Sequence, residues 1–143
     1  HSSPFPQPRR LSTTPNPFAT LSGMTLTHHQ RQQIQHNLQQ QGVLAAWLYG
    51  SYAKGTANQH SDVDLAVLLL EDQDDWQILP ELDYELSKAL HLTVHCVSIA
   101  KTPTPLAYEA VEGERLFGDA DAMFMEQRIW SKWDEWLYWS QRA

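Results

Sequence analysis

The spacing of apolar and polar positions predicts one domain in which helices and strands alternate. Helices are expected where apolar residues recur every three or four positions, and strands where short apolar or β-branched runs end at glycine, proline or acidic residues. The predicted helices span residues 27–41, 76–90, 104–112 and 121–142, and the predicted strands span 43–50, 62–70, 92–99 and 114–118. This order indicates an α/β or α+β fold.

Local signals define the ends of these elements. Thr25 or Thr27 is a suitable cap for the first helix, and Gly42 ends it. Thr104 and Pro105 have the residue types of a helix cap and first position. Pro80 lies inside the second helix, where it is tolerated only near a helix start or at a break between two short helices. We therefore expect one of these two arrangements at Pro80.

The first 23 residues differ from the rest of the chain. They are rich in proline and serine, contain no acidic residue and show neither a helical nor a strand period. They also lack the apolar core of a secretory signal. We expect residues 1–23 to be an appended leader, with a native extension of no fixed structure as the alternative, and residues 24–143 to form the domain.

Composition excludes several classes of protein. The net charge of −7 lacks the basic footprint of a general nucleic-acid binder, so no direct nucleic-acid partner is expected. No apolar run reaches the roughly 18 residues of a membrane span, so no membrane partner is expected either. Cys96 is the single cysteine, which rules out an intrachain disulfide and favours a reducing compartment such as the cytoplasm.

Two carboxylates interrupt the predicted strand at residues 62–70. Side chains two positions apart point to the same face of a strand, so Asp62 and Asp64 are expected to project together. Unpaired, they would repel each other and be costly to desolvate, whereas Mg²⁺ is commonly held by one or two carboxylates together with substrate phosphates. The alternative is an exposed strand start whose carboxylates bond loop amides.

A glycine–serine pair ends the preceding strand. Gly50 permits a sharp turn and close approach to a ligand, and Ser51 offers a hydroxyl and a backbone amide. If a helix begins here, its first amides favour an anion, and Lys54 adds a positive charge. Taken alone, this pair is more typical of an ordinary turn. Combined with Asp62 and Asp64 on the next strand, it predicts a site where a triphosphate and Mg²⁺ meet.

The stretch from Gly50 to Asp64 resembles a known signature. Gly50-Ser51, ten intervening residues and Asp62-Val63-Asp64 are similar to the motif of minimal nucleotidyltransferases in the DNA polymerase β superfamily, and the resemblance covers most of residues 24–119. It implies a small mixed β-sheet flanked by helices. It also implies catalytic, metal-binding Asp62 and Asp64, and nucleotide-binding Gly50, Ser51 and Lys54.

Within this superfamily the chain is most similar to the minimal nucleotidyltransferase (MNT) antitoxins of HEPN/MNT toxin–antitoxin pairs. That resemblance implies an Mg²⁺-dependent enzyme that transfers AMP from ATP to a tyrosine of its partner, a HepT-like RNase toxin of the HEPN family. Two alternatives remain: a non-catalytic antitoxin that masks the toxin by binding, and a nucleotidyltransferase that modifies a small molecule. The latter enzymes usually need an additional substrate-binding domain.

One position departs from the superfamily pattern. A third aspartate usually lies on a later strand, where this chain has His95. A neutral imidazole supplies no negative charge, and Mg²⁺ prefers oxygen ligands. His95 is either a base for the attacking hydroxyl, since its unperturbed pKa lies near neutrality, or a structural strand residue.

The last predicted helix carries a series of tryptophans at a spacing of three. Because three residues turn a helix by about 300°, the series drifts around the axis and makes the apolar surface broader than one core-facing stripe. Part of this surface is expected to cover the sheet, and the rest is expected to bind a protein partner, as tryptophan is enriched in interface hot spots. The residues concerned are Trp130, Trp133, Trp136 and Trp139.

Overall fold

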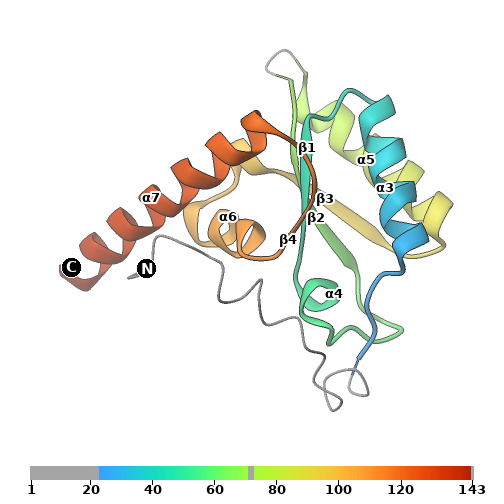
Figure 1. The fold of residues 1–143 in the computed structure, drawn as a ribbon, viewed down its shortest axis with the longest axis horizontal. Helices are drawn as coiled ribbons and strands as arrows, with labels where there is room; N and C mark the ends of the chain where they lie inside the picture. Colours follow the sequence, from blue (N-terminus) through green and yellow to red (C-terminus); the bar gives the residue numbers. More distant parts are fainter. Residues whose placement is uncertain (1–22, 71–72, 143) are drawn as a thin grey trace.

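The computed structural model describes residues 23–70 and 73–142, which form a four-stranded sheet with helices on both faces (Figure 1). The strand order is β3-β2-β1-β4. β1 (Ala45–Tyr49) pairs antiparallel with β2 (Val63–Leu68) and with β4 (Glu114–Phe117). β2 pairs parallel with β3 (Val94–Ser98). The sheet is therefore mixed, and the predicted short edge strand at residues 114–118 is present as β4.

Helices α3 (His28–Gln40) and α5 (Asp75–Leu90) cover one face of the sheet. Helices α6 (Thr104–Val111) and α7 (Ala120–Arg142) lie on the other face. Two short elements complete the fold: α4 (Ser51–Lys54), directly after β1, and the 3₁₀ turn η1 (Ile99–Lys101), directly after β3. The alternation of helices and strands predicted from the sequence is confirmed.

The central strand β1 is buried along its whole length. Leu48 faces the cluster under α3 and α5, whereas Trp47 and Tyr49 face the cluster under α6 and α7. A strand covered on both faces needs a continuous apolar run, which explains why residues 45–49 show no alternation of polar and apolar residues. The end of this buried strand fixes the position of the turn that follows it.

Two features near the starts of helices, the cap of α3 and the proline in α5, can be compared with the expectations from the sequence. Thr27 caps α3 through a complete capping box, since its hydroxyl accepts from the Gln30 amide and the Gln30 side chain accepts from the Thr27 amide. Pro80 lies in α5 soon after its start at Asp75, and the helix continues through it as one element, so of the two expected arrangements the break into two short helices is not the one found. The amide missing at Pro80 would bond the carbonyl of Trp76, whose side chain is 74% exposed, and water can satisfy that first-turn carbonyl.

Side chains of α5 close the outer edge of β3. Ser87 Oγ accepts from the Val94 amide at 2.9 Å, and Asp83 Oδ1 accepts from the Cys96 amide at 2.7 Å. These are the amides that point away from β2, so the edge strand has no free donors at these positions. Asp83 therefore helps to hold β3 in place next to β2, the strand that carries Asp64.

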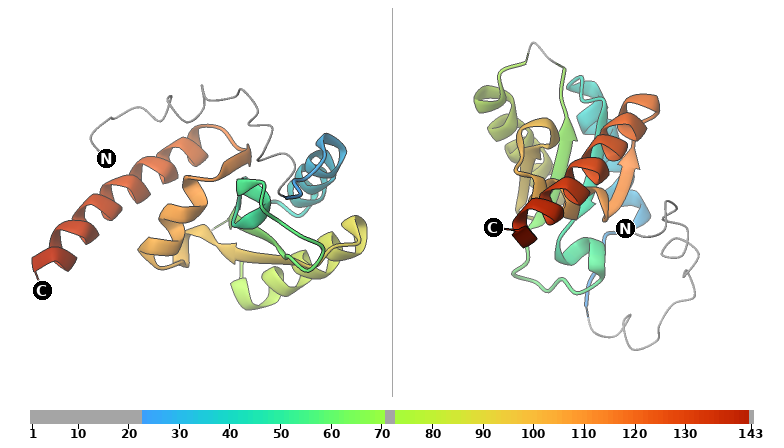
Figure 2. Two further views of the ribbon diagram at one scale, coloured as in Figure 1. Left: turned by 90° about the horizontal axis from the view of Figure 1, so that it is seen from below. Right: turned by 90° about the vertical axis from the view of Figure 1, so that its left-hand side faces the viewer.

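Helix α7 begins against the sheet and extends beyond the body of the domain (Figure 2). Ala122, Glu126 and Ile129 are its buried residues, all in its first half. Buried Glu126 accepts a hydrogen bond from Trp47 Nε1 at 2.8 Å, and its other oxygen lies 3.7 Å from Arg115 Nη1. The far half of α7 is half-buried or exposed.

No helix in the described ranges, 23–70 and 73–142, is both long and apolar enough to cross a membrane. The predicted leader, residues 1–23, lies outside the described residues apart from Gly23.

Candidate active site

The turn after β1 is built around glycine. Gly50 has φ +75° and ψ −155°, a combination that only glycine adopts without strain. α4 then begins at Ser51, and the Gly50 carbonyl accepts from the amides of Ala53 and Lys54 at 3.1 Å each. The first amides of a helix have no partner within the helix and favour negative charge. The expected helix start after Gly50 is thus present, with Lys54 in its last turn.

Gly50 and Asp64 lie in contact across the antiparallel pair of β1 and β2. Tyr49 is the register partner of Asp64, which brings the end of β1 next to the carboxylate. A Cβ atom placed on Gly50 would stand 2.5 Å from Asp64 Oδ2. The glycine therefore serves two purposes: it allows the turn and it makes room for the carboxylate.

The two aspartates lie close enough to interact electrostatically. Asp62 is exposed and directly precedes β2, which begins at Val63, whereas Asp64 is half-buried within the strand. Burial raises the pKa of Asp64, and the neighbouring charge of Asp62 raises it further. His95 opposes these effects and lowers the pKa of Asp64, as a nearby positive charge does.

The pair has the donor type and the uncompensated charge that suit a hard divalent cation. Carboxylate oxygens are ligands that Mg²⁺ prefers, and a cation would relieve the mutual repulsion between Asp62 and Asp64. Among residues 23–70 and 73–142, no group of three or more His, Cys, Asp or Glu side chains is arranged to hold a metal. Two protein carboxylates with phosphate oxygens of a nucleotide fit this arrangement better than a cage made by the protein alone.

His95 is the register partner of Asp64 on the parallel strand β3, in the position expected for the third carboxylate of the superfamily. Its imidazole is exposed, and its Nδ1 lies 3.8 Å from Asp83 Oδ2, which is beyond ordinary hydrogen-bond length. The structure thus brings His95 beside the carboxylate pair, with Asp83 behind it.

A pocket of about 340 Å³ adjoins the turn on the α6 side of the sheet. Gly50 and Lys54 form one side of this pocket, and Tyr108 and Glu109 of α6 form another. Burial raises the pKa of Tyr49, which also lines the pocket, to about 12, and the charges of Asp64 and Glu109 contribute. The Tyr49 hydroxyl therefore stays protonated.

Tyr49, Tyr108 and Glu109 were not predicted as site residues. Tyr49 directly precedes Gly50 in the sequence, and this position next to the turn could have identified it as a site residue. Glu109 lies more than 40 residues further along the chain, and only the packing of α6 against β1 brings it to the pocket. Its charge raises the pKa of Asp64 as well as that of Tyr49, so Glu109 acts on both.

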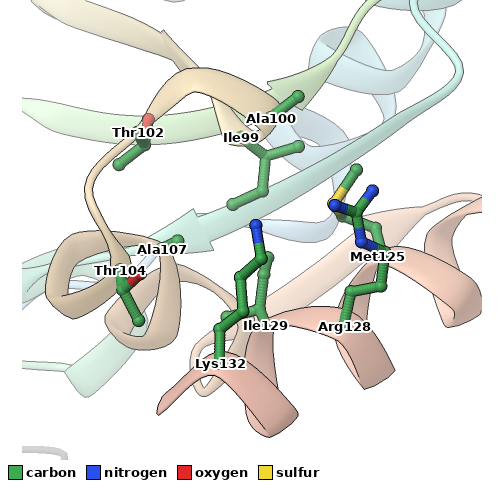
Figure 3. Close-up of a pocket in the computed structure, with 9 residues that line it drawn as sticks. All are labelled: Ile99, Ala100, Thr102, Thr104, Ala107, Met125, Arg128, Ile129 and Lys132. Carbon is green, nitrogen blue, oxygen red and sulfur yellow. The ribbon is translucent and has the colours of Figure 1, made fainter. Parts of the chain in front are cut away.

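A second surface runs along α7. A small cavity of about 60 Å³ lies between η1, the start of α6 and α7, and the side chains of Arg128 and Lys132 extend from α7 towards it (Figure 3). A larger, more open groove of about 520 Å³ shares Lys132 with this cavity and is lined by Trp136 and Trp139. Cationic and aromatic groups therefore adjoin on the same side of the helix.

The four tryptophans of α7 divide into two pairs. Trp130 donates to Glu112 Oε2 at 2.8 Å, and Trp133 stacks on Tyr108 with 4.4 Å between ring centroids. These two lie against α6. Trp136 stacks on Trp133 at 5.0 Å but remains 43% exposed, and Trp139 is 62% exposed. The predicted apolar surface is thus partly core and partly free.

A mixed sheet whose first strand leads into a Gly-Ser turn, with Asp-x-Asp at the start of the second strand beside that turn, is typical of a nucleotidyltransferase of the polymerase β type. The chain matches the family described as Polymerase beta, Nucleotidyltransferase over residues 32–122, and it belongs to this family. The predicted superfamily and fold class are confirmed.

Among individual proteins, the chain is similar to the protein adenylyltransferase MntA of Shewanella oneidensis. The two are 36% identical over 76 residues, which cover 50% of this chain and 52% of MntA, so the chain spans about half the length of that relative. The predicted resemblance to the MNT antitoxins is confirmed.

Solved toxin–antitoxin structures have the same fold. One, a toxin–antitoxin crystal structure with AMP-PNP, has a TM-score of 0.70 and 26% identity, covering 78% of this chain and 93% of its own. Another, a tri-AMPylated Shewanella oneidensis HEPN toxin in complex with its MNT antitoxin, has a TM-score of 0.67 and 22% identity, covering 82% and 94%.

Proposed function

We propose that this protein is an antitoxin that transfers AMP from ATP to a tyrosine of a partner RNase toxin of the HEPN family. The observation that carries the proposal is the contact between Gly50 and Asp64, which joins a phosphate-type turn to a metal-type carboxylate pair. Similarity to MntA and to the AMP-PNP structure supports adenylyl transfer and ATP as the donor.

In the proposed reaction the acceptor oxygen attacks the α-phosphorus of ATP, and the bond to the departing pyrophosphate breaks. The α4 turn, with Ser51 and Lys54, binds the triphosphate through amides, a hydroxyl and a cation. Asp62 and Asp64 would hold Mg²⁺, which neutralises charge on the phosphates when bound. The Asp64 carboxylate lies against Gly50, so it adjoins the turn that would bind the triphosphate.

The exposed end of α7 is the proposed contact with the toxin. Trp136 and Trp139 are large aromatic side chains that no core cluster of the described residues includes. Lys132 adds positive charge beside them in the same groove, and Arg128 lines the adjoining small cavity. Aromatic residues with adjacent charges are typical of interface hot spots.

The test is the mass of a purified HEPN toxin after incubation with this protein, ATP and Mg²⁺. The HEPN toxin of the Shewanella oneidensis pair is a suitable acceptor, and the chain carrying both Asp62→Ala and Asp64→Ala is the inactive control. We expect the toxin to gain the mass of one or more AMP groups with the wild type only, at a tyrosine located by peptide mapping. Stable binding of the toxin without any gain in mass would instead favour an antitoxin that acts by masking.

A further inference from the structure

The pocket beside Gly50 has features that suit the acceptor of the proposed transfer better than the nucleotide. Two tyrosines, Tyr49 and Tyr108, contribute to its lining, and three of its other residues are glutamates, against one cation, Lys54. Outside the immediate surroundings of Lys54, the glutamates would repel a triphosphate. They would not repel a neutral side chain that carries a hydroxyl group. At about 340 Å³, the pocket has room for an aromatic side chain.

The three glutamates of the pocket differ in their surroundings. Glu114 receives two hydrogen bonds from Arg31, at 2.8 and 2.9 Å, which tie β4 to α3. Glu112 accepts from Trp130 and so ties α6 to α7. Glu109, by contrast, is exposed, and no described residue forms a hydrogen bond or ion pair with it. Two of the carboxylates are thus structural, and the third is available to a ligand.

Glu109 lies on the same side of the site as the Asp62 and Asp64 carboxylates. It lines the same pocket as Gly50, and Gly50 contacts Asp64. β3, where the superfamily usually supplies a third acid, offers the imidazole of His95 instead. Negative charge close to the carboxylate pair therefore comes from α6, on the face of the sheet that holds the pocket.

We infer that this pocket is the acceptor site, and that Glu109 is a further catalytic residue that accepts the proton of the attacking hydroxyl. This inference rests on the proposed adenylyl transfer. As the acceptor oxygen bonds to the α-phosphorus, the bond from that phosphorus to pyrophosphate breaks, and the hydroxyl proton passes to the Glu109 carboxylate, which releases it to water. A phenol is the acceptor class that best fits the lining, because Tyr49 and Tyr108 offer aromatic contacts.

The aromatic stack on α7 connects this pocket to the proposed docking surface. Tyr108 lines the pocket and stacks on Trp133, which stacks in turn on Trp136. A partner seated on Trp136 and Trp139 would therefore lie on a surface continuous with the acceptor pocket. This continuity explains how one bound protein could present a side chain to Glu109.

The experiment uses N-acetyl-tyrosinamide as a small phenolic probe that needs no docking surface. Its binding to the full chain in the presence of Mg²⁺ and AMP-PNP is measured by NMR titration, and its adenylylation with Mg²⁺ and ATP by mass spectrometry. The proteins compared are the wild type, Glu109→Gln and Glu81→Gln, a matched change at an exposed glutamate of α5 on the opposite face of the sheet. Affinity for AMP-PNP and thermal unfolding are recorded for each.

We expect Glu109→Gln to weaken probe binding about tenfold, since a hydrogen bond to a charged group is lost. Any transfer to the probe should fall about 100-fold or more, with AMP-PNP affinity and thermal unfolding unchanged. Glu81→Gln should match the wild type throughout. Equal probe binding by the wild type and Glu109→Gln, no binding by the wild type, or a loss of AMP-PNP affinity in Glu109→Gln would each overturn the inference. The toxin mass assay decides the proposed function separately, because it scores transfer by the wild type alone.

Discussion

The indole N–H of Trp47 donates to the Glu126 carboxylate at 2.8 Å, joining the centre of β1 to the first half of α7. Trp47 is fully buried and Glu126 is 5% exposed. Arg115 of β4 lies on the other side of the same carboxylate, with its Nη1 buried. One acidic side chain therefore fixes the long helix on the sheet that carries the site.

We predict that Glu126→Ala lowers the free energy of unfolding by about 2–4 kcal/mol. The change leaves a buried indole N–H without its acceptor and removes the negative charge that lies 3.7 Å from the Arg115 guanidinium. Glu126→Gln should cost less, because the amide oxygen can still accept from Trp47. Urea denaturation of the three proteins tests this order, and equal stability of the two variants would show that the hydrogen bond contributes little.

Two glycines allow the backbone strain at the turn to be separated from the contact with Asp64. Gly50→Ala introduces a Cβ 2.5 Å from Asp64 Oδ2, whereas at Gly55, which also has positive φ, nothing lies within 4 Å of the added atom. We expect Gly55→Ala to lose about 1–2 kcal/mol, the cost of a left-handed backbone for alanine, and Gly50→Ala to lose more, because its ψ of −155° lies outside the left-handed region. Only Gly50→Ala should also lose adenylyl transfer, because it displaces the carboxylate. Loss of transfer in Gly55→Ala of the same size would contradict this role for the contact.

The raised pKa of Asp64 predicts a pH dependence of stability. Its ordinary value is 3.8, and the folded protein holds the proton more tightly than the unfolded chain does. The stability contributed by this group is therefore present below pH 3.8 and is lost as the pH rises through the raised pKa. Asp64→Asn should remove this loss, so that with EDTA the variant is more stable than the wild type at neutral pH.

Thermal unfolding of both proteins across this pH range, with Glu81→Gln as the control, measures the effect of Asp64. Adding Mg²⁺ and AMP-PNP should reverse the order at neutral pH, because only the wild type retains the carboxylate that the cation needs. An Asp64→Asn variant that is less stable than the wild type at every pH without metal would contradict the assignment.

His95→Ala should keep at least a tenth of the wild-type transfer rate, a barrier change below about 1.4 kcal/mol. The imidazole is exposed and lies 3.8 Å from its nearest acidic partner, so it is loosely held for a base. His95→Asp should be tolerated. A fall of several hundredfold in His95→Ala, with unchanged folding, would show that the histidine takes part in proton transfer.

Replacing Trp139 with alanine should weaken association with the toxin more than it lowers stability, since its side chain is 62% exposed. Trp133→Ala is the contrasting variant, because it removes the stacking on Tyr108 that holds α7 against α6. It should reduce thermal stability by about 3 kcal/mol or less, in view of its partial burial. Calorimetric titration with the toxin and thermal unfolding of both variants separate the two effects.

The order of elements and the core of the site could be predicted from local sequence because Gly50, Ser51, Asp62 and Asp64 lie within one strand–turn–strand unit. Two arrangements stayed open at Pro80 because the cost of a proline depends on whether the carbonyl four residues earlier can reach water, which the sequence does not state. Glu109 and Glu126 gave no signal in the sequence. Their surroundings arise from how α6 and α7 pack on the sheet, and a helical acid looks the same in sequence whether it faces solvent, a pocket or an indole.

The graded burial of the tryptophans has an optical consequence. Trp47 is fully enclosed beside a carboxylate, whereas Trp136 and Trp139 are exposed to solvent at 43% and 62%. The fluorescence of the free protein should therefore combine a blue-shifted component from the core with a red-shifted component from the end of α7 and from Trp76 on α5, which is 74% exposed. The exposed tryptophans should be accessible to quenching by iodide, whereas Trp47 should not. A protein that covers the end of α7 would shield Trp136 and Trp139 but leave Trp76 on α5 accessible, so docking can be followed as a partial loss of quenching without any added label.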